Sequence, residues 1–280
     1  MTLIGIETFK TFRRWRTYLG FLAVLGAVIL LEVIVKLNLA HFSQAYARGL
    51  SNEFVVSGNI INAWAIAAFT LNSLYIHVPF LITLVAGDMV SAEAASGTLR
   101  LLLIRPPSRS RIIVAKYSAM MIYTGLLIIF LAALCIGLGL LLFGTGDLIR
   151  FQVMPPQMVI LPQSIAVPRT LLAFLFAILA MSVVGSLAFL FSTMVDNSIG
   201  PIIGAMAIVI VFTIVGTLPF ESLEAIRPYL FTTYMDIWQL PLDNPVNWLE
   251  VLKYALALIG HDALFFGAAF FIFVRKDIKS

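Results

Sequence analysis

Ser91–Lys116 reads SAEAASGTLRLLLIRPPSRSRIIVAK and forms a basic, polar interruption between two very apolar stretches. It carries five of the eighteen Lys and Arg residues of the chain. No charged residue occurs in the 34 residues Phe54–Gly87 on one side, or in the 30 residues Tyr117–Gly146 on the other. Because a helix needs about 20 apolar residues to cross a bilayer, the sequence predicts a membrane span on each side of this loop.

The composition points to an integral membrane protein. Hydrophobic residues make up 61% of the 280 residues, charged residues make up 11%, and the mean hydropathy is +1.03. A soluble domain has roughly 25% charged residues. We therefore expect one all-α transmembrane domain over residues 1–280. Six runs reach spanning length, at 17–35, 63–86, 112–143, 170–195, 199–220 and 254–274, which places both termini on one side of the membrane.

The distribution of basic residues predicts the orientation. Twelve Lys and Arg residues fall in the N-terminal segment, in the loop 87–111 with Lys116 at its edge, and in the C-terminal tail, against six elsewhere. Since cytoplasmic segments carry the excess of Lys and Arg, these three segments are predicted to be cytoplasmic. The net charge of +4 is then a topology signal. We expect the lipid bilayer as a partner and no nucleic acid.

Residues 1–16 combine apolar and basic faces. Ile6, Phe9, Phe12 and Trp15 recur every three residues, and basic residues lie between them. This pattern fits a short helix in the cytoplasmic headgroup plane. It also fits a simple basic flank that orients the first span, and the two interpretations are compatible.

Three polar residues, Asn72, Ser73 and His77, stand in the second predicted span. Polar groups in a span face protein or water, so they either pack between helices or line a substrate path. Pro79 removes a backbone donor and is expected to kink this span.

Two ionisable pairs lie in or near other spans. Glu32 and Lys36 stand four residues apart near the outer end of the first span, which predicts an ion pair at the interface. In the last span, His261 and Asp262 form an intramembrane polar pair. This pair is either a proton relay or a neutral, hydrogen-bonded packing pair.

The connecting segments also carry local signals. Leu148–Arg169 contains four prolines, which predicts an irregular external loop with no helix through its middle. Asp196-Asn197-Ser198 favours a tight cytoplasmic hairpin that Asn197 or Ser198 caps. Residues 221–253 are external, acidic and aromatic, and short interfacial helices are expected there. Gly185 and Gly204 would allow another helix to approach closely, in this chain or in a second copy.

No catalytic site is predicted. His41, His77 and His261 lack metal-ligand spacing, and the phosphate-binding loop Gly-x-x-x-x-Gly-Lys-Ser/Thr is missing. Gly144-Thr-Gly-Asp147 matches the Gly-x-Gly-Asp signature of intramembrane aspartyl proteases. The other candidate aspartate, Asp88, belongs to the opposite membrane face, so the two could not share a proton. We expect that the chain is not an enzyme and binds no cofactor or metal.

The opening stretch itself predicts a short helix with a small-residue face. Ser91–Thr98 holds mainly Ser, Ala and Gly around one carboxylate, Glu93, and Gly97 weakens or ends a helix there. Pro106 and Pro107 stop any further helix. Small side chains would let a partner surface come close.

This stretch resembles a known loop. The order Glu93-x-x-x-Gly97-Thr98-Leu99-x-Leu-Leu-Leu, then Pro106-x-x-Arg109, then Lys116 is similar to the loop between spans two and three in the membrane subunits of ATP-binding-cassette (ABC) type-2 exporters. In that family the loop is the coupling helix, which sits in a cleft of a separate ATPase subunit. The resemblance implies ATPase contacts at Ser91, Glu93, Ser96, Gly97, Thr98, Leu99, Arg100, Arg105, Pro106 and Arg109.

The resemblance also implies partners and a location. Two ATPase subunits would use ATP and Mg²⁺ and drive substrate export, and a second membrane subunit, identical or related, would complete the path. The expected location is the cell membrane, the inner or plasma membrane of a bacterium. The alternative is a proton-coupled secondary transporter that uses His261 and Asp262, and a membrane enzyme comes third.

Overall fold

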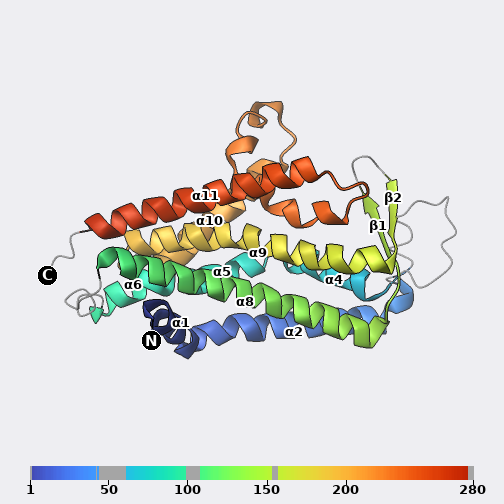
Figure 1. Cartoon of the computed structure of the whole chain (residues 1–280), viewed down its shortest axis with the longest axis horizontal. Coiled ribbons are helices and arrows are strands. Elements are labelled where there is room, and N and C mark those ends of the chain that lie inside the picture. The colour runs from blue at the N-terminus through green and yellow to red at the C-terminus, as the bar shows by residue number, and fades with distance from the viewer. Residues whose placement is uncertain (1, 42, 44–60, 99–107, 153–156, 277–280) are drawn as a thin grey trace.

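The computed structural model describes residues 2–41, 43, 61–98, 108–152 and 157–276. Its helices run side by side as an elongated bundle, with a small β-hairpin at one end (Figure 1). The α-helices are α1 (Leu3–Arg13), α2 (Trp15–Leu37), α4 (Ala63–Leu74), α5 (Val78–Ala86), α6 (Asp88–Ala95), α8 (Arg109–Phe143), α9 (Gln163–Met194), α10 (Ile199–Thr217) and α11 (Trp248–Arg275).

Six helical segments in the described part of the chain are long and apolar enough to cross a membrane, as predicted. Helix α1 and the last turn of α11 lie at the same end of the bundle, which we call the basic end (Figure 1). Arg109 at the start of α8 fixes this arrangement, because it donates to the carbonyl oxygens of Val274 and Lys276, at 3.3 and 2.9 Å. These features are expected of a multi-pass membrane protein.

Helix α9 is the centre of the bundle. Every residue from Ala180 to Phe189 is buried, because small side chains alternate with Val, Leu and Phe on all sides. A helix that is apolar all round belongs in a core. A Cβ atom built on Gly185 would lie 2.6 Å from Sδ of Met120 and 3.4 Å from Ile82. The predicted close approach at Gly185 is therefore confirmed, and the neighbours are α8 and α5 of the same chain.

The second span is broken, where the sequence predicted one kinked helix over 63–86. Helix α4 ends at Leu74 and α5 begins at Val78. The break lies before Pro79 because the proline has no N–H for the carbonyl of residue 75 and its ring collides with that carbonyl. Beyond Gly87 the chain continues directly into α6, so α5 and the expected coupling helix form one continuous helical segment, Val78–Ala95.

The segment Leu148–Arg169 has no helix through its middle, as predicted, but it is not an irregular loop. Strands β1 (Leu148–Gln152) and β2 (Gln157–Leu161) pair antiparallel, with Leu148 opposite Leu161. Helix α9 then begins at Gln163, seven residues earlier than expected, and includes Pro168. The reason is a cap: the Asp147 carboxylate accepts the backbone N–H of Gln163 at 2.9 Å, which satisfies a free donor at the helix start.

The other connections agree with the sequence. Helices α9 and α10 are joined by a tight turn in which Asn197 accepts the N–H of Gly200 at 2.6 Å. Within the aromatic segment 221–253, residues 221–242 form short 3-10 helices: η1 (Glu221–Leu223), η2 (Arg227–Tyr229), η3 (Phe231–Trp238) and η4 (Leu240–Leu242). One of them, η3, buries Phe231, Ile237 and Trp238 against α9, α10 and α11. Helix α11 begins at Trp248, six residues before the predicted start of the last span at 254.

The predicted ion pair between Glu32 and Lys36 is wrong. Lys36 turns away to donate to the carbonyl oxygen of Leu142, and it also lies over the ring of Phe143. Glu32 is fully buried, and neither of its carboxyl oxygens has a hydrogen-bond partner among the residues that the structure describes. The competing carbonyl of Leu142 at the end of α8 explains why spacing along one helix did not decide the pairing.

Replacing Glu32 by leucine is expected to stabilise the protein by about 1–2 kcal/mol, because a buried polar group without partners costs about this much. Unfolding with SDS in mixed micelles measures the change. Glu32→Gln keeps a buried polar group and should bring no gain. A clear loss of stability in Glu32→Leu would show that the carboxyl group has a favourable partner.

Candidate functional site

The tip of α6 projects from the basic end, and the base of this helix is held by α9. The backbone N–H groups of Val90 and Ser91 both donate to Oγ of Ser192 at 3.0 Å. Ser91 itself is buried and donates to the carbonyl oxygen of Gly87 at 2.6 Å. Its side chain is therefore used inside the chain.

Glu93 is also buried, in a cluster of charges from three helices. The ammonium group of Lys116, on α8, lies 2.7 Å from Oε2 of Glu93 on α6 and 2.9 Å from Oε2 of Glu7 on α1. All three side chains are at most 8% exposed. We call these three residues the buried triad. It ties α1 and α6 to the third span.

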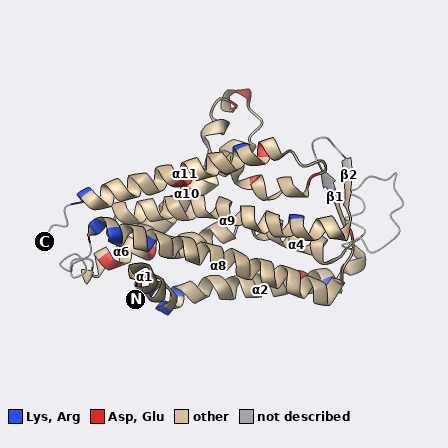
Figure 2. Cartoon of the chain, in the orientation of Figure 1, with Lys and Arg blue, Asp and Glu red and all other residues tan. Residues whose placement is uncertain are grey.

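Further charged residues contact the triad, and Figure 2 shows blue and red ribbon segments gathered at the end of the bundle where α1 and α6 lie. Lys10 reaches Glu7 at 2.8 Å and Glu93 at 3.6 Å, and Arg14 reaches Glu93 at 3.8 Å. Arg16 pairs with Asp88 at 2.8 Å. The predicted amphipathic segment 1–16 thus does form a helix, α1, and its polar side faces α6.

The electrostatics favour the ionised form of the Glu7 carboxyl. Burial by itself raises the pKa of the Glu7 carboxyl, but Lys116 and Lys10 together more than reverse this, so its pKa lies below the ordinary value. A buried charge is tolerated only where it is paired, and two carboxylates around one ammonium leave a net negative charge that Lys10 and Arg14 offset. Removing a single member would leave unpaired charge behind.

The last residues of α6 face outward. Ala95, Ser96, Gly97 and Thr98 are exposed, and Gly97 has a φ of 71°, which ends the helix as the sequence predicted. The hydroxyl groups of Ser96 and Thr98 lie 2.8 Å apart. We call Ala95–Thr98 the α6 tip.

Two hollows, of about 400 and 700 Å³, flank the α6 tip. Residues of the α1–α2 corner, Arg13 and Arg14, line both of them. Ser198, from the turn between α9 and α10, lines the larger one. The tip therefore stands between two recesses with basic walls.

The other predicted contact residues divide into two groups. Arg109 is used within the chain, where it binds the end of α11 as described above. Leu99, Arg100, Arg105 and Pro106 lie outside the described residues.

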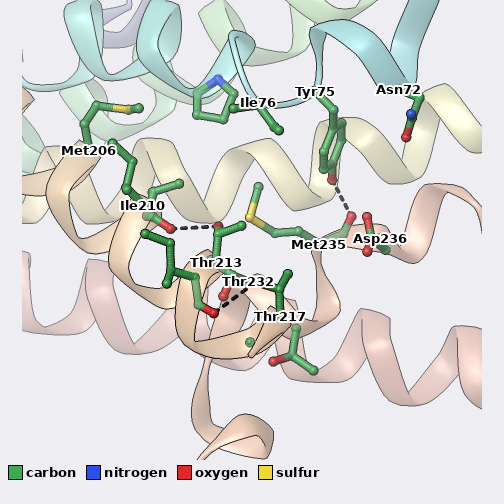
Figure 3. A pocket seen from close by; sticks show the side chains of 15 residues that line it. Asn72, Tyr75, Ile76, Met206, Ile210, Thr213, Thr217, Thr232, Met235 and Asp236 are labelled. Carbon is green, nitrogen blue, oxygen red and sulfur yellow. Dashed lines mark hydrogen bonds between the residues drawn. The ribbon is translucent and has the colours of Figure 1, made fainter. Parts of the chain in front are cut away.

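A pocket of about 490 Å³ opens between α4, α5, α10 and η3 (Figure 3). Of the three candidate path residues, Asn72 lines this pocket. His77 lines a neighbouring apolar hollow of about 540 Å³. Ser73 donates to the carbonyl oxygen of Phe69 at 2.9 Å and lines neither. The three residues therefore do not form one site.

The pocket contains residues that the sequence did not single out. The hydroxyl group of Tyr75, in the break of the second span, donates to the carbonyl oxygen of Met235 and joins the break to η3 (Figure 3). Next to Met235, the Asp236 carboxylate is exposed to the pocket. One signal could have pointed to Asp236: it is a carboxylate among the aromatic residues of segment 221–253.

His261 and Asp262 do not hydrogen-bond to each other. Asp262 accepts from Ser182 and Ser186 of α9, at 2.5 and 2.6 Å. The two ring nitrogens of His261 instead lie 2.8 Å from the carbonyl oxygen of Ala257 and 3.3 Å from that of Tyr229. Adjacent residues on a helix point about 100° apart, which explains the separation. Asp262 attaches α11 to α9.

No cluster of three or more His, Cys, Asp or Glu side chains that could hold a metal ion occurs in the part of the chain that the structure describes. The described residues show two features that could serve a function: the exposed α6 tip at the basic end and the pocket between α4, α5, α10 and η3.

Sequence comparison places the chain in a family. The family model described as "Protein of unknown function (DUF2705)" matches residues 23–279. The chain belongs to the DUF2705 family. It is also similar to "Uncharacterized protein YhcI" of Bacillus subtilis (strain 168), with 33% identity over 100 residues, which cover 34% of this chain and 32% of that protein. The match to YhcI thus spans about a third of either chain.

The DUF2705 match begins after α1, so Glu7 lies outside it, while Glu93 and Lys116 lie inside. The family region therefore contains the pair that joins α6 to the third span. It also contains every residue of the 490 Å³ pocket.

Proposed function

We propose that this DUF2705 protein is the membrane-spanning subunit of an ABC exporter. A separate ATPase subunit would hold the α6 tip on the cytoplasmic side, and ATP hydrolysis there would move substrate across or out of the membrane. The six spans and the motif from Glu93 to Lys116 support this proposal. The observation that carries it is the contrast within α6, where an exposed tip follows a base that the buried triad fixes.

This contrast suits the transmission of force. The α6 tip continues through Gly87 into α5, and Gly87 packs against Ile202 of α10. Since packed helices shift as bodies rather than deform, a push on the tip moves α5 against α10. These two helices border the 490 Å³ pocket, so the contact site and the substrate path would be mechanically joined.

The partners follow from the same proposal. ATP and Mg²⁺ would be bound by two ATPase subunits and not by this chain, which would have no enzymatic activity itself. A second membrane subunit, identical or related, would complete the path. The basic end carries α1 and the end of α11, and by the positive-inside rule it would face the cytoplasm of a bacterial cell.

A bulky residue at the tip should break this contact. We expect Ser96→Trp to reduce co-purification with the ABC ATPase subunit, and ATP-driven transport by the pair, at least tenfold. Ser96 is exposed and lines both hollows, so the fold should tolerate the change. Co-expression, affinity purification and assays in proteoliposomes provide the measurement.

The matched control is Ser222→Trp, the same change at an exposed position of the external segment, which should leave both readouts intact. The proposal fails if the wild-type chain binds no ATPase subunit. It also fails if transport runs on a proton gradient without ATP, as the alternative with His261 and Asp262 requires.

A further inference from the structure

The 490 Å³ pocket has one polar and one apolar wall. Ile76, Pro79, Met206 and Ile210 supply apolar surface from α5, α10 and the break between α4 and α5. On the other side, Thr213 and Thr217 of α10 face Thr232 and Asp236 of η3 (Figure 3). A ligand that fits both walls must be amphipathic.

The charge of the polar wall is negative. Asp236 is the one charged side chain among the described residues that line the pocket. Its Oδ1 atom accepts from Nε2 of Gln239 at 3.3 Å. Asp236 is exposed to the pocket, but the surrounding protein removes part of its hydration and so raises the pKa of its carboxyl. No basic side chain among the described lining residues compensates its negative charge. A bound cation would supply that compensation.

The nearest basic residue along the segment is directed elsewhere. Arg227 of η2 donates to the carbonyl oxygen of Leu218 at 2.5 Å and does not line the pocket. Its backbone carbonyl, not its guanidinium group, contacts the lining residue Thr233. The positive charge is therefore held outside the cavity.

The threonine hydroxyl groups present acceptors. Thr213 and Thr217 donate their protons to the carbonyl oxygens of Val209 and Ile214, at 2.8 and 3.0 Å, and Thr233 donates to Arg227 at 2.9 Å. A hydroxyl group whose proton is already used offers only lone pairs. Thr232 adds a buried hydroxyl oxygen that has no hydrogen-bond partner in the described part of the chain. This wall is suited to a ligand that brings hydrogen-bond donors or positive charge.

We propose that this pocket binds an amphipathic organic cation, with Asp236 as its counter-ion and the threonine hydroxyl groups as acceptors. The inference rests on the exporter function proposed above and names its class of substrate. An organic anion of the same size would meet Asp236 without a compensating positive group, and it would be rejected.

Two probes of equal size and shape but opposite charge test this proposal: tetraphenylphosphonium and tetraphenylborate. Binding is measured by equilibrium dialysis to the full-length protein in nanodiscs of neutral lipid, with empty nanodiscs subtracted. We expect the cation to bind at least tenfold more tightly than the anion. Asp236→Asn keeps the size of the side chain and should weaken cation binding about tenfold, because a partly buried charge pair contributes more than 1.4 kcal/mol.

A matched control and a second variant complete the test. Glu224→Gln removes one negative charge from an exposed part of the same segment and should leave the affinity unchanged. Ile210→Trp fills the pocket from α10 and should reduce cation binding while Asp236 is retained. The proposal is overturned if both probes bind equally, or if Asp236→Asn and Ile210→Trp bind the cation as the wild type does.

This experiment needs neither ATP nor a partner subunit. If cation binding depends on Asp236 but the chain binds no ATPase subunit, the cation site is supported and the exporter function is rejected. If the chain supports ATP-driven transport but its cation binding does not change in Asp236→Asn, only the proposed cation site is rejected.

Discussion

Lys116→Ala is expected to lower the free energy of unfolding by about 3–5 kcal/mol, which is the usual effect of removing one partner from a buried ion pair. The Lys116 ammonium group is 1% exposed and lies within 3 Å of carboxylates from both α1 and α6. Without it, Glu7 and Glu93 would face each other in a buried site. SDS titration in mixed micelles measures the stability, and proteolysis reports whether α1 detaches.

The control for this variant is Lys10→Ala. Lys10 contacts the same two carboxylates, but its side chain is 36% exposed, so its loss should cost at most about 1 kcal/mol. Combining Lys116→Met with Glu7→Gln and Glu93→Gln removes the buried charges together and should recover much of the stability. Equal effects of Lys116→Ala and Lys10→Ala would contradict a special role for the buried triad.

Gly87→Leu is expected to destabilise the protein by about 3 kcal/mol, at the upper end of what overpacking costs. A Cβ atom at Gly87 would lie 2.8 Å from the carbonyl oxygen of Thr83, 2.9 Å from Cγ1 of Ile202 and 3.2 Å from the backbone nitrogen of Ile202. Backbone atoms cannot move aside as the end of a side chain can. The joint between α5 and α6 would separate from the first turn of α10.

Thermal unfolding in detergent measures this effect, and Gly26→Leu is the control. No atom lies within 4 Å of a Cβ built on Gly26, and leucine favours a helix by almost 1 kcal/mol over glycine, so this change should be neutral or stabilising. If Gly87→Leu behaved like Gly26→Leu, the packing of α5 and α6 on α10 would not be tight, and the proposed transmission of movement to α10 would lose its basis.

Local signals in the sequence predicted local structure well. The end of α6 at Gly97 and the turn at Asn197 depend on the backbone of a few neighbouring residues, so they could be predicted from residue type alone. The effect of Pro168 was predicted wrongly, because the start of its helix depends on a residue that is distant in the sequence. A proline argues against a helix only until a cap elsewhere in the chain starts that helix earlier, and here the cap is Asp147, 16 residues before Gln163.

Pairing between distant residues was not predictable in this way. Spacing along one helix predicted that Lys36 pairs with Glu32, but the lysine donates to the carbonyl oxygen of Leu142, 106 positions away in the sequence. The resemblance predicted that Glu93 contacts a partner protein, whereas in the structure its carboxylate pairs with the ammonium group of Lys116. Asp236 could not be placed at all, because only the packing of η3 against α10 brings it to the break of the second span.

The sequence by itself determined the class of this protein, its number of spans and its expected orientation. These follow from the transfer of apolar residues into lipid and from the distribution of Lys and Arg, which need no knowledge of contacts. The tertiary structure alone decided which charges are buried together and where a ligand could enter. Electrostatic pairs act over a few ångströms, so they depend on which helices lie side by side, and a linear pattern does not contain that information.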